Sequence, residues 1–279
     1  PKPSSAASDV YKRQLSGQAV TVENKPGGNG FIGVQTALNP PHDGHTVFIG
    51  SNSTLTTNAA TFRKLPYDPI ADFAPITLLS RGACLVIVPA ASAHRSLADL
   101  VADARKRPGK LNYASGSMSY TLYSEWFNEM AKIKTAGINY KGAGEAVNAV
   151  LTGEVDFAVV DATGANELAR SGRVRALAFT APKRSIVLTE VPTVGEAGYP
   201  DYLAFNWVAA AVSSKAPPAA LEQLGALFAK AAQTPEIQAY YRKQGTELIM
   251  SSAPELRRYQ AEEIERWKRL MGITGIELQ

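Results

Sequence analysis

Short apolar runs rich in β-branched residues alternate along this chain with segments of helical periodicity. A strand, a helix and a second strand in succession build a parallel pair of strands, because the helix carries the chain back to the same end of the sheet. The pattern therefore predicts an α/β fold with mostly parallel sheets flanked by helices. The strand-like runs cover residues 19–23, 46–50, 75–79, 84–88, 111–114, 137–139, 155–159, 173–179 and 205–212.

The last third of the chain is predicted to be helical, over residues 219–232, 235–244 and 254–270. Pro235 follows Thr234, as a proline at the first position of a helix should. We expect these helices to return to the first lobe, and 279 residues suffice for two domains. The predicted domains are lobe one, residues 15–88 plus 213–279, and lobe two, residues 89–212, with the hinge near Val88-Pro89 and Val212-Ser213.

The first residues differ from the rest. Residues 1–14 are polar and of low complexity, and they lack the apolar core of a signal peptide. We expect this segment to be disordered or foreign to the fold.

The net charge of +4 raises the question of a nucleic-acid partner. The tightest basic group, Arg105, Lys106, Arg107 and Lys110, falls at a predicted helix end, where cations complement the helix dipole. The remaining cations are dispersed, which favours a solvated face and no nucleic-acid partner. The one cysteine, Cys84, stands in an apolar run and is predicted to be buried and unpaired.

Four strand-to-helix junctions carry small or polar residues suited to a ligand. In open α/β sheets, ligands bind beyond the carboxyl ends of the strands. Helix N-termini there present free N–H groups that favour an anion, and serine hydroxyls add neutral donors. The sequence therefore predicts a site for a small polar anion. The candidate residues are Ser51, Asn52, Ser53, Ser115, Gly116, Ser117, Ser119, Tyr140, Gly142 and Asp161.

Each junction alone also has a purely structural interpretation. Serine and glycine are common helix-capping and turn residues. Asp161 is as well suited to capping its helix as to facing a ligand. Trp207, which we include among the candidate ligand-binding residues, lies in an apolar strand and is equally compatible with the core and with the lining of a cleft.

Enzymatic interpretations find little support. Gly116-Ser117-Met118-Ser119-Tyr120 lacks the closing glycine of a nucleophile elbow. A serine hydrolase built on residues 115–119 would need a histidine base, and none lies in the junction loops of lobe two. His42 and His45 flank an Asp-Gly turn that explains them better than a metal site does. We therefore predict no catalytic residues, no metal and no cofactor.

Several motifs resemble the Bug family, the TctC-like binding proteins of tripartite tricarboxylate transporters. The clearest are Glu23-Asn24-Lys25-Pro26-Gly27 with the glycines that follow, and Leu65-Pro66-Tyr67-Asp68-Pro69 through Pro75. Tyr140-Lys141-Gly142-Ala143-Gly144 and the segment Val191–Gly198 extend the match from about Leu15 to the end of the chain.

The resemblance implies a periplasmic, type II Venus-flytrap protein that closes two lobes on a small carboxylate and catalyses nothing. It implies a monomer that delivers its ligand to the membrane components of a tripartite tricarboxylate transporter. It assigns the ligand-facing positions to Ser51–Ser53, to residues 115–119 and to Asp161. A sensor subunit that binds the same ligand and docks a signalling partner remains the alternative.

One departure from the family pattern concerns the start of the chain. Family members begin with a strand, a glycine-rich loop and a long helix, and residues 1–14 resemble none of these. In the family this glycine-rich loop forms half of the carboxylate-binding site. The resemblance therefore implies that this half is lacking, so we expect this chain to bind its ligand weakly or not at all.

Overall fold

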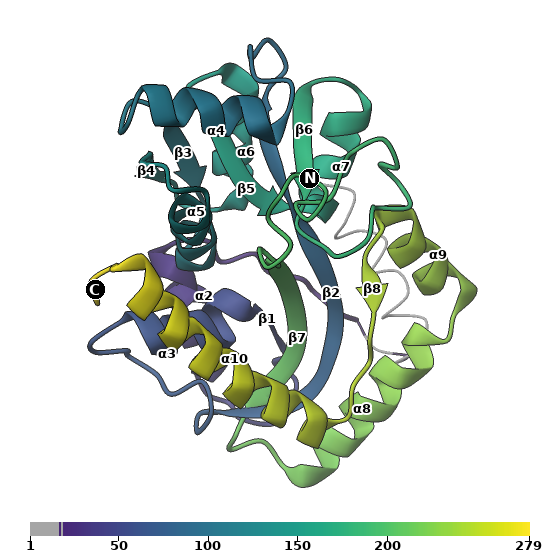
Figure 1. The fold of residues 1–279 in the computed structure, drawn as a ribbon. Coiled ribbons are helices and arrows are strands. Elements are labelled where there is room, and N and C mark those ends of the chain that lie inside the picture. Colours follow the sequence, from purple (N-terminus) through teal and green to yellow (C-terminus); the bar gives the residue numbers. More distant parts are fainter. Residues whose placement is uncertain (1–16, 18) are drawn as a thin grey trace.

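A single long strand joins the two lobes of the molecule. The computed structural model describes residue 17 and residues 19–279; the predicted disordered segment, residues 1–14, lies outside them. Strand β2 (Phe73–Pro89) pairs with β7 (Phe205–Ser213) over its first part and with β5 (Phe157–Asp161) and β6 (Val174–Phe179) over its last part. Figure 1 shows β2 passing through the middle of the molecule, with elements of both lobes around it.

Lobe two lies in the upper half of Figure 1 and is a sheet covered by helices. The parallel neighbours β5, β3 (Asn112–Ser115) and β4 (Ala136–Asn139) form one side of this sheet, with β4 at its edge. Ser96 and Asp99 form a capping box at the start of its first helix. The helices are α4 (Leu97–Lys106), α5 (Met118–Ala131), α6 (Ala143–Thr152) and α7 (Ala162–Arg170).

Lobe one contains β1 (Phe48–Ser51), β7, the first part of β2 and the short β8 (Glu247–Leu248). A 3-10 turn, Gly28–Gly30, leads into its first helix, and a π-helix, Ser53–Thr57, follows β1. The three predicted C-terminal helices are confirmed. The helices of this lobe are α2 (Phe31–Leu38), α3 (Asn58–Thr61), α8 (Pro218–Ala232), α9 (Pro235–Gln244) and α10 (Ala253–Thr274).

The prediction of mostly parallel sheets is wrong for the described strands. β2 runs antiparallel to β5, β6, β7 and β8, and β1 runs antiparallel to β7. The reason is topological: the chain enters lobe two along β2 and returns along β7, so these crossing segments run in opposite directions. Only β3 pairs in parallel with its neighbours β4 and β5.

The strand pairing places the boundary between the two lobes earlier in the sequence than predicted. β2 changes partners between Ala83, which pairs with Phe205, and Cys84, which pairs with Asp161. The two sheets therefore meet a few residues before the expected boundaries at Val88-Pro89 and Val212-Ser213. Cys84 is fully buried there, as predicted.

The predicted strand at residues 19–23 is not present. This segment has no regular structure and is mostly exposed. A strand needs a neighbour for its backbone N–H and C=O groups, and no strand of the described chain pairs with it. Its apolar alternation alone therefore does not define a strand.

Helix α10 belongs to lobe one but contacts both lobes. Trp267, Leu270 and Met271, near its end, lie in the same buried cluster as Tyr123 and Phe127 of α5. The rings of Trp267 and Tyr123 are 5.0 Å apart. This packing holds the two lobes together at a place distant in sequence from β2 and β7.

Candidate functional site

Three helices of lobe two begin at one edge of its sheet. α5 follows β3, α6 follows β4 and α7 follows β5. Because β3 is parallel to both β4 and β5, the carboxyl ends of the three strands share this edge. The positive ends of the three helix dipoles are thereby gathered on one side of the lobe.

The first two of these helices carry no side-chain cap. Ser117 and Gly142 occupy the N-cap positions of α5 and α6, and no side chain at either position caps the first turn. The backbone N–H groups of Tyr120 and Glu145 donate back to the carbonyls of these N-cap residues, which leaves the N–H groups of the first two residues of each helix without a helical partner. Two such termini side by side suit a carboxylate, whose two oxygens accept several such bonds.

Glycine at position 116 brings the two termini together. A Cβ atom on Gly116 would lie 2.5 Å from the carbonyl carbon of Gly142, closer than real contacts allow. The backbone N–H of Tyr140 also donates to the Ser115 carbonyl, at 2.8 Å. The predicted loops 115–119 and 140–142 thus form one surface.

Lobe one meets this surface with hydroxyl groups. The Ser53 hydroxyl lies 3.0 Å from those of both Ser117 and Ser119. Thr57 extends the cluster, with its hydroxyl 2.7 Å from that of Ser119. The structure therefore brings together the predicted loops of the two lobes at Ser53, Ser117 and Ser119. Thr57 was missed, although it belongs to the same hydroxyl-rich run after β1.

Ser51 and Asn52 do not reach lobe two through their hydroxyl and amide groups in the same way. Asn52 is buried; its side-chain amide donates to the Phe205 carbonyl on β7 at 3.4 Å, and its carbonyl accepts the hydroxyls of Thr56 and Thr57 within the π-helix. The Ser51 carbonyl accepts the hydroxyl of Thr54 at 3.2 Å. These bonds hold the π-helix that carries Ser53 and tie it to β7.

Asp161 caps α7 and contacts the other lobe. Its Oδ1 accepts the N–H of Thr163 at 2.9 Å, and its Oδ2 accepts the side-chain amide of Asn206, on β7, at 3.0 Å. Burial raises the pKa of Asp161 above the usual aspartate value, although both hydrogen bonds favour the ionised form. Asn206, absent from the sequence-based site, is the partner that ties this carboxylate to lobe one.

The raised pKa of Asp161 predicts a pH-dependent stability. Asp161 takes up a proton at a higher pH in the folded state than in the unfolded state. Its protonation therefore stabilises the fold fully at a pH below the pKa of Asp161 in the unfolded chain, and this stabilisation is lost as the pH rises through the pKa of Asp161 in the folded chain. We expect wild type to gain stability relative to Asp161→Asn as pH falls from 7 toward 4. Urea unfolding of both proteins across this range measures the difference, and parallel curves would contradict the raised pKa.

Tyr140 and Trp207 do not face the hydroxyl cluster. The Tyr140 hydroxyl donates to Glu154 at 2.7 Å, and desolvation together with this bond raises the pKa of Tyr140 to about 12. Trp207 is fully buried, and its indole N–H donates to Glu263 at 3.2 Å. The assignment of Trp207 as cleft lining is therefore wrong in this structure; it is a core residue, because α10 covers its face of β7.

The serine cluster lacks the partners of a nucleophile. Ser115 bonds to the Ser117 carbonyl and to the Thr121 hydroxyl, and Ser119 bonds to other hydroxyls. His94, the histidine of lobe two, is bonded instead to Ser92, before α4, and to Asp103, in the second half of α4. Across residues 19–279, no group of three His, Cys, Asp or Glu side chains is arranged to hold a metal ion.

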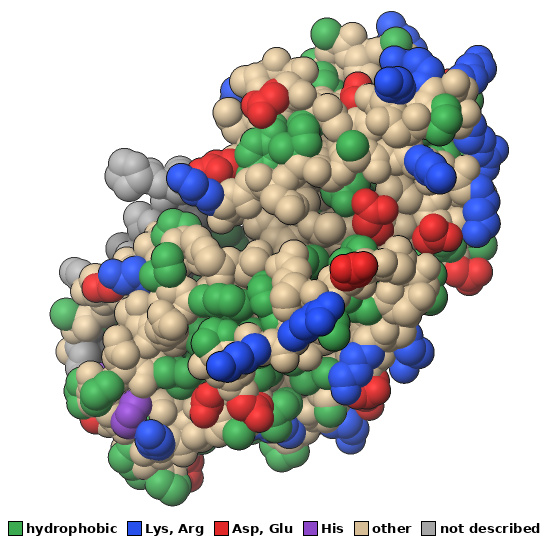
Figure 2. Space-filling model, turned by 90° about the vertical axis from the view of Figure 1, so that its left-hand side faces the viewer, with side chains coloured by type: hydrophobic (Ala, Val, Ile, Leu, Met, Phe, Trp, Pro, Cys, Tyr) green, Lys and Arg blue, Asp and Glu red, His purple; other side chains and the backbone are tan. Residues whose placement is uncertain are grey.

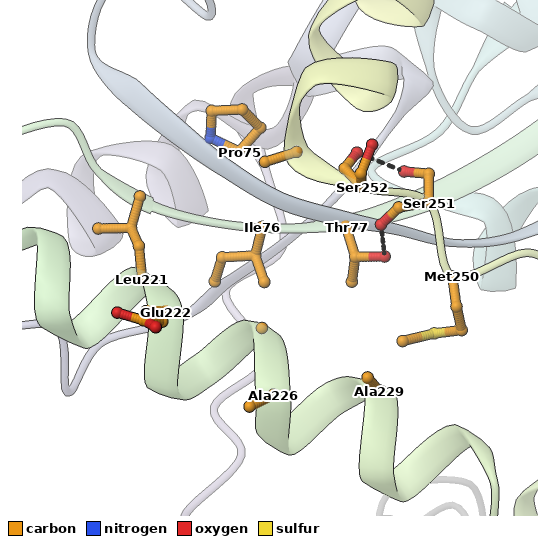
Figure 3. A pocket seen from close by; sticks show the side chains of 12 residues that line it. Pro75, Ile76, Thr77, Leu221, Glu222, Ala226, Ala229, Met250, Ser251 and Ser252 are labelled. Atoms are coloured by element: carbon orange, nitrogen blue, oxygen red, sulfur yellow. Dashed lines mark hydrogen bonds between the residues drawn. The ribbon is translucent and has the colours of Figure 1, made fainter.

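A separate groove of about 430 Å³ lies in lobe one (Figure 3). It runs between α8 and the segment that leads into α10, with Ile76, Leu221 and Met250 along it and the Glu222 carboxylate at one side. Its apolar lining and its acidic side chain make it unsuited to a small anion. None of the described helices is long and apolar enough to cross a membrane.

Comparison with known proteins points to a single family. A sequence model described as "Tripartite tricarboxylate transporter family receptor" (TctC) matches residues 5–276. The match therefore begins within residues 1–14, the segment in which no motif of the family was recognised. It covers both lobes and all the junctions described above.

Solved structures agree with this match. One described as "Structure of a periplasmic transporter" is 26% identical, with a TM-score of 0.92 and 97% of this chain and 91% of the other covered. R. palustris Rpa4515 with adipate is 27% identical, with a TM-score of 0.93 and coverage of 98% and 92%. MatC (Rpa3494) from Rhodopseudomonas palustris with bound malate is 25% identical, with a TM-score of 0.87 and coverage of 94% and 91%.

Proposed function

The chain belongs to the TctC family of tripartite tricarboxylate transporter receptors, a family of binding proteins and not of enzymes, and from this premise we propose that it captures a small carboxylate between its two lobes. It then delivers the ligand, in the periplasm, to the membrane components of such a transporter. The observation that carries the proposal is the pair of adjacent helix termini without side-chain caps, of which the terminus of α5 contacts the hydroxyl of Ser53 from lobe one. Adipate and malate, bound in two similar structures, indicate the size and charge of the ligand.

Neutral donors are sufficient for this task. Backbone N–H groups and hydroxyls bind an anion through charge-assisted hydrogen bonds, which are stronger than bonds between neutral groups. A ligand held by both lobes favours the closed state by its higher affinity for it. The Ser53–Ser117 and Ser53–Ser119 contacts mark where the lobes meet, so a ligand there would be enclosed by groups from both sides.

Ser117→Ala tests the site directly. Ser117 is half-buried at the N-cap of α5, so its hydroxyl can be removed with little loss of packing. A hydrogen bond to a charged group contributes about 1.5–3 kcal/mol, so we expect affinity to fall roughly tenfold or more. A thermal-shift screen of mono-, di- and tricarboxylates, with adipate and malate included, selects the probe, and calorimetry measures its affinity.

Ser171→Ala is the matched control. The Ser171 hydroxyl bonds only to carbonyls of its own helix end, away from the three gathered termini. An affinity that is unchanged in Ser117→Ala, or reduced equally in both variants, would overturn the site assignment. The same titration of wild type measures the weak binding that the motif comparison predicts.

A further inference from the structure

Two loops distant in sequence form one basic surface at an end of lobe two. The N–H of Gly109 donates to the carbonyl of Lys134 at 2.8 Å, and the Arg105 guanidinium donates to the carbonyl of Ala131 at 2.7 Å. These bonds join the loop after α4 to the loop after α5. We call this surface the basic tip; its cations are Arg105, Lys106, Arg107, Lys110, Lys132 and Lys134, all exposed.

The basic tip keeps a positive charge after its ion pairs are counted. Asp103 pairs with Arg107, and Glu129 lies 3.6 Å from Lys132. Among the described residues, no ion pair involves Lys106, Lys110 or Lys134. Figure 2 shows Lys and Arg side chains gathered along the outer margin of the upper lobe, which is lobe two.

Buried neighbours hold these lysines at the surface. Leu111 and Ile133, next to Lys110 and to the pair Lys132 and Lys134, are both in the core of lobe two. The tip has no large exposed apolar side chain among the described residues. A surface of charges without an apolar or aromatic anchor is unlike the centre of a protein–protein interface, but it suits a diffuse layer of negative charge such as lipid headgroups.

The tip also faces away from the candidate site. Its loops precede β3 and β4, whereas the hydroxyl cluster follows the other ends of these strands, roughly 13 Å farther along. A surface docked at the tip would therefore leave the ligand site open.

We infer that the basic tip docks the protein on an anionic phospholipid surface, beyond its proposed role in ligand capture. Each lysine near such a surface adds to the attraction, and salt weakens it within the Debye length, which falls from about 10 Å at 0.1 M to about 3 Å at 1 M. Docking would concentrate the receptor beside membrane-bound partners without burying any apolar group.

Co-sedimentation with vesicles tests this inference. The probes are vesicles of phosphatidylcholine alone and vesicles that mix it with phosphatidylglycerol. We expect wild type to bind only the mixed vesicles and to be released by high salt. The variant Lys106→Glu, Lys110→Glu, Lys134→Glu should lose about tenfold or more in binding, since three attractions become repulsions.

A control variant separates the tip from net charge. Lys215→Glu, Lys230→Glu, Lys243→Glu makes the same change of charge at exposed lysines of lobe one and should keep most of the binding. Equal loss in both variants, or no binding of wild type to mixed vesicles, would overturn the inference. So would binding only to neutral vesicles that carry the transporter's membrane components, which would identify an acidic protein face as the partner. Carboxylate affinity, unchanged in both variants, keeps this test independent of the proposed function.

Discussion

Gly116→Ala is expected to weaken carboxylate binding by more than tenfold and to destabilise the fold by about 1–3 kcal/mol, the usual cost of forcing extra atoms into a packed site. The new Cβ would fall 2.5 Å from the Gly142 carbonyl carbon, and backbone atoms cannot swing aside as a flexible side chain would. The termini of α5 and α6 must then separate. Because both would bind one carboxylate, their separation removes donors that no other residue replaces.

Urea unfolding and calorimetric titration with the selected carboxylate measure both effects. Gly225→Ala is the control, because a Cβ there meets open space inside α8, where alanine favours the helix by up to about 1 kcal/mol. If Gly116→Ala bound ligand as wild type does, the two helix termini would not act as one site.

Local signals in the sequence predicted most helices. Pro235 after Thr234 marks a helix start that depends only on neighbouring residues, and it was placed correctly; the capping box of Ser96 and Asp99 is a local signal of the same kind. Strand direction was not predictable in this way. The antiparallel pairing of β2 with β7 depends on a chain that leaves lobe one and returns more than a hundred residues later, and no local periodicity records that path.

The same difference between local and long-range signals applies to the candidate site. The sequence could place Ser53 and Ser117 at the contact between the lobes because each follows the end of a strand, and the carboxyl ends of strands gather where sheets bind ligands. Thr57 and Asn206 were missed because their roles come from contacts across the lobes, with Ser119 and Asp161 respectively. Trp207 was misassigned because an aromatic residue in an apolar strand has the same pattern whether a helix covers it or not.

Trp267 contacts residues of both lobes at a place outside the hinge. It is fully buried on α10, packs against Tyr123 of lobe two, and donates its indole N–H to the Thr56 hydroxyl of lobe one at 3.1 Å. Trp267→Ala removes both contacts and leaves a cavity, so we expect the free energy of unfolding to fall by about 3–5 kcal/mol. Trp267→Phe keeps the ring packing and should lose only about 1 kcal/mol with the hydrogen bond.

A second buried tryptophan separates loss of packing from loss of lobe contact. Trp207→Ala also opens a cavity, but its neighbours Leu55, Leu78 and Leu256 all belong to lobe one. Both alanine variants should unfold at lower urea, yet only Trp267→Ala should speed amide hydrogen exchange in α5, because that helix loses its support from α10. Equal protection of α5 in the two variants would mean that the packing of Trp267 does not support α5. Faster exchange confined to Trp267→Ala would establish α10 as a connection between the lobes beyond β2 and β7, and its packing against α5 would have to change when the ligand site opens.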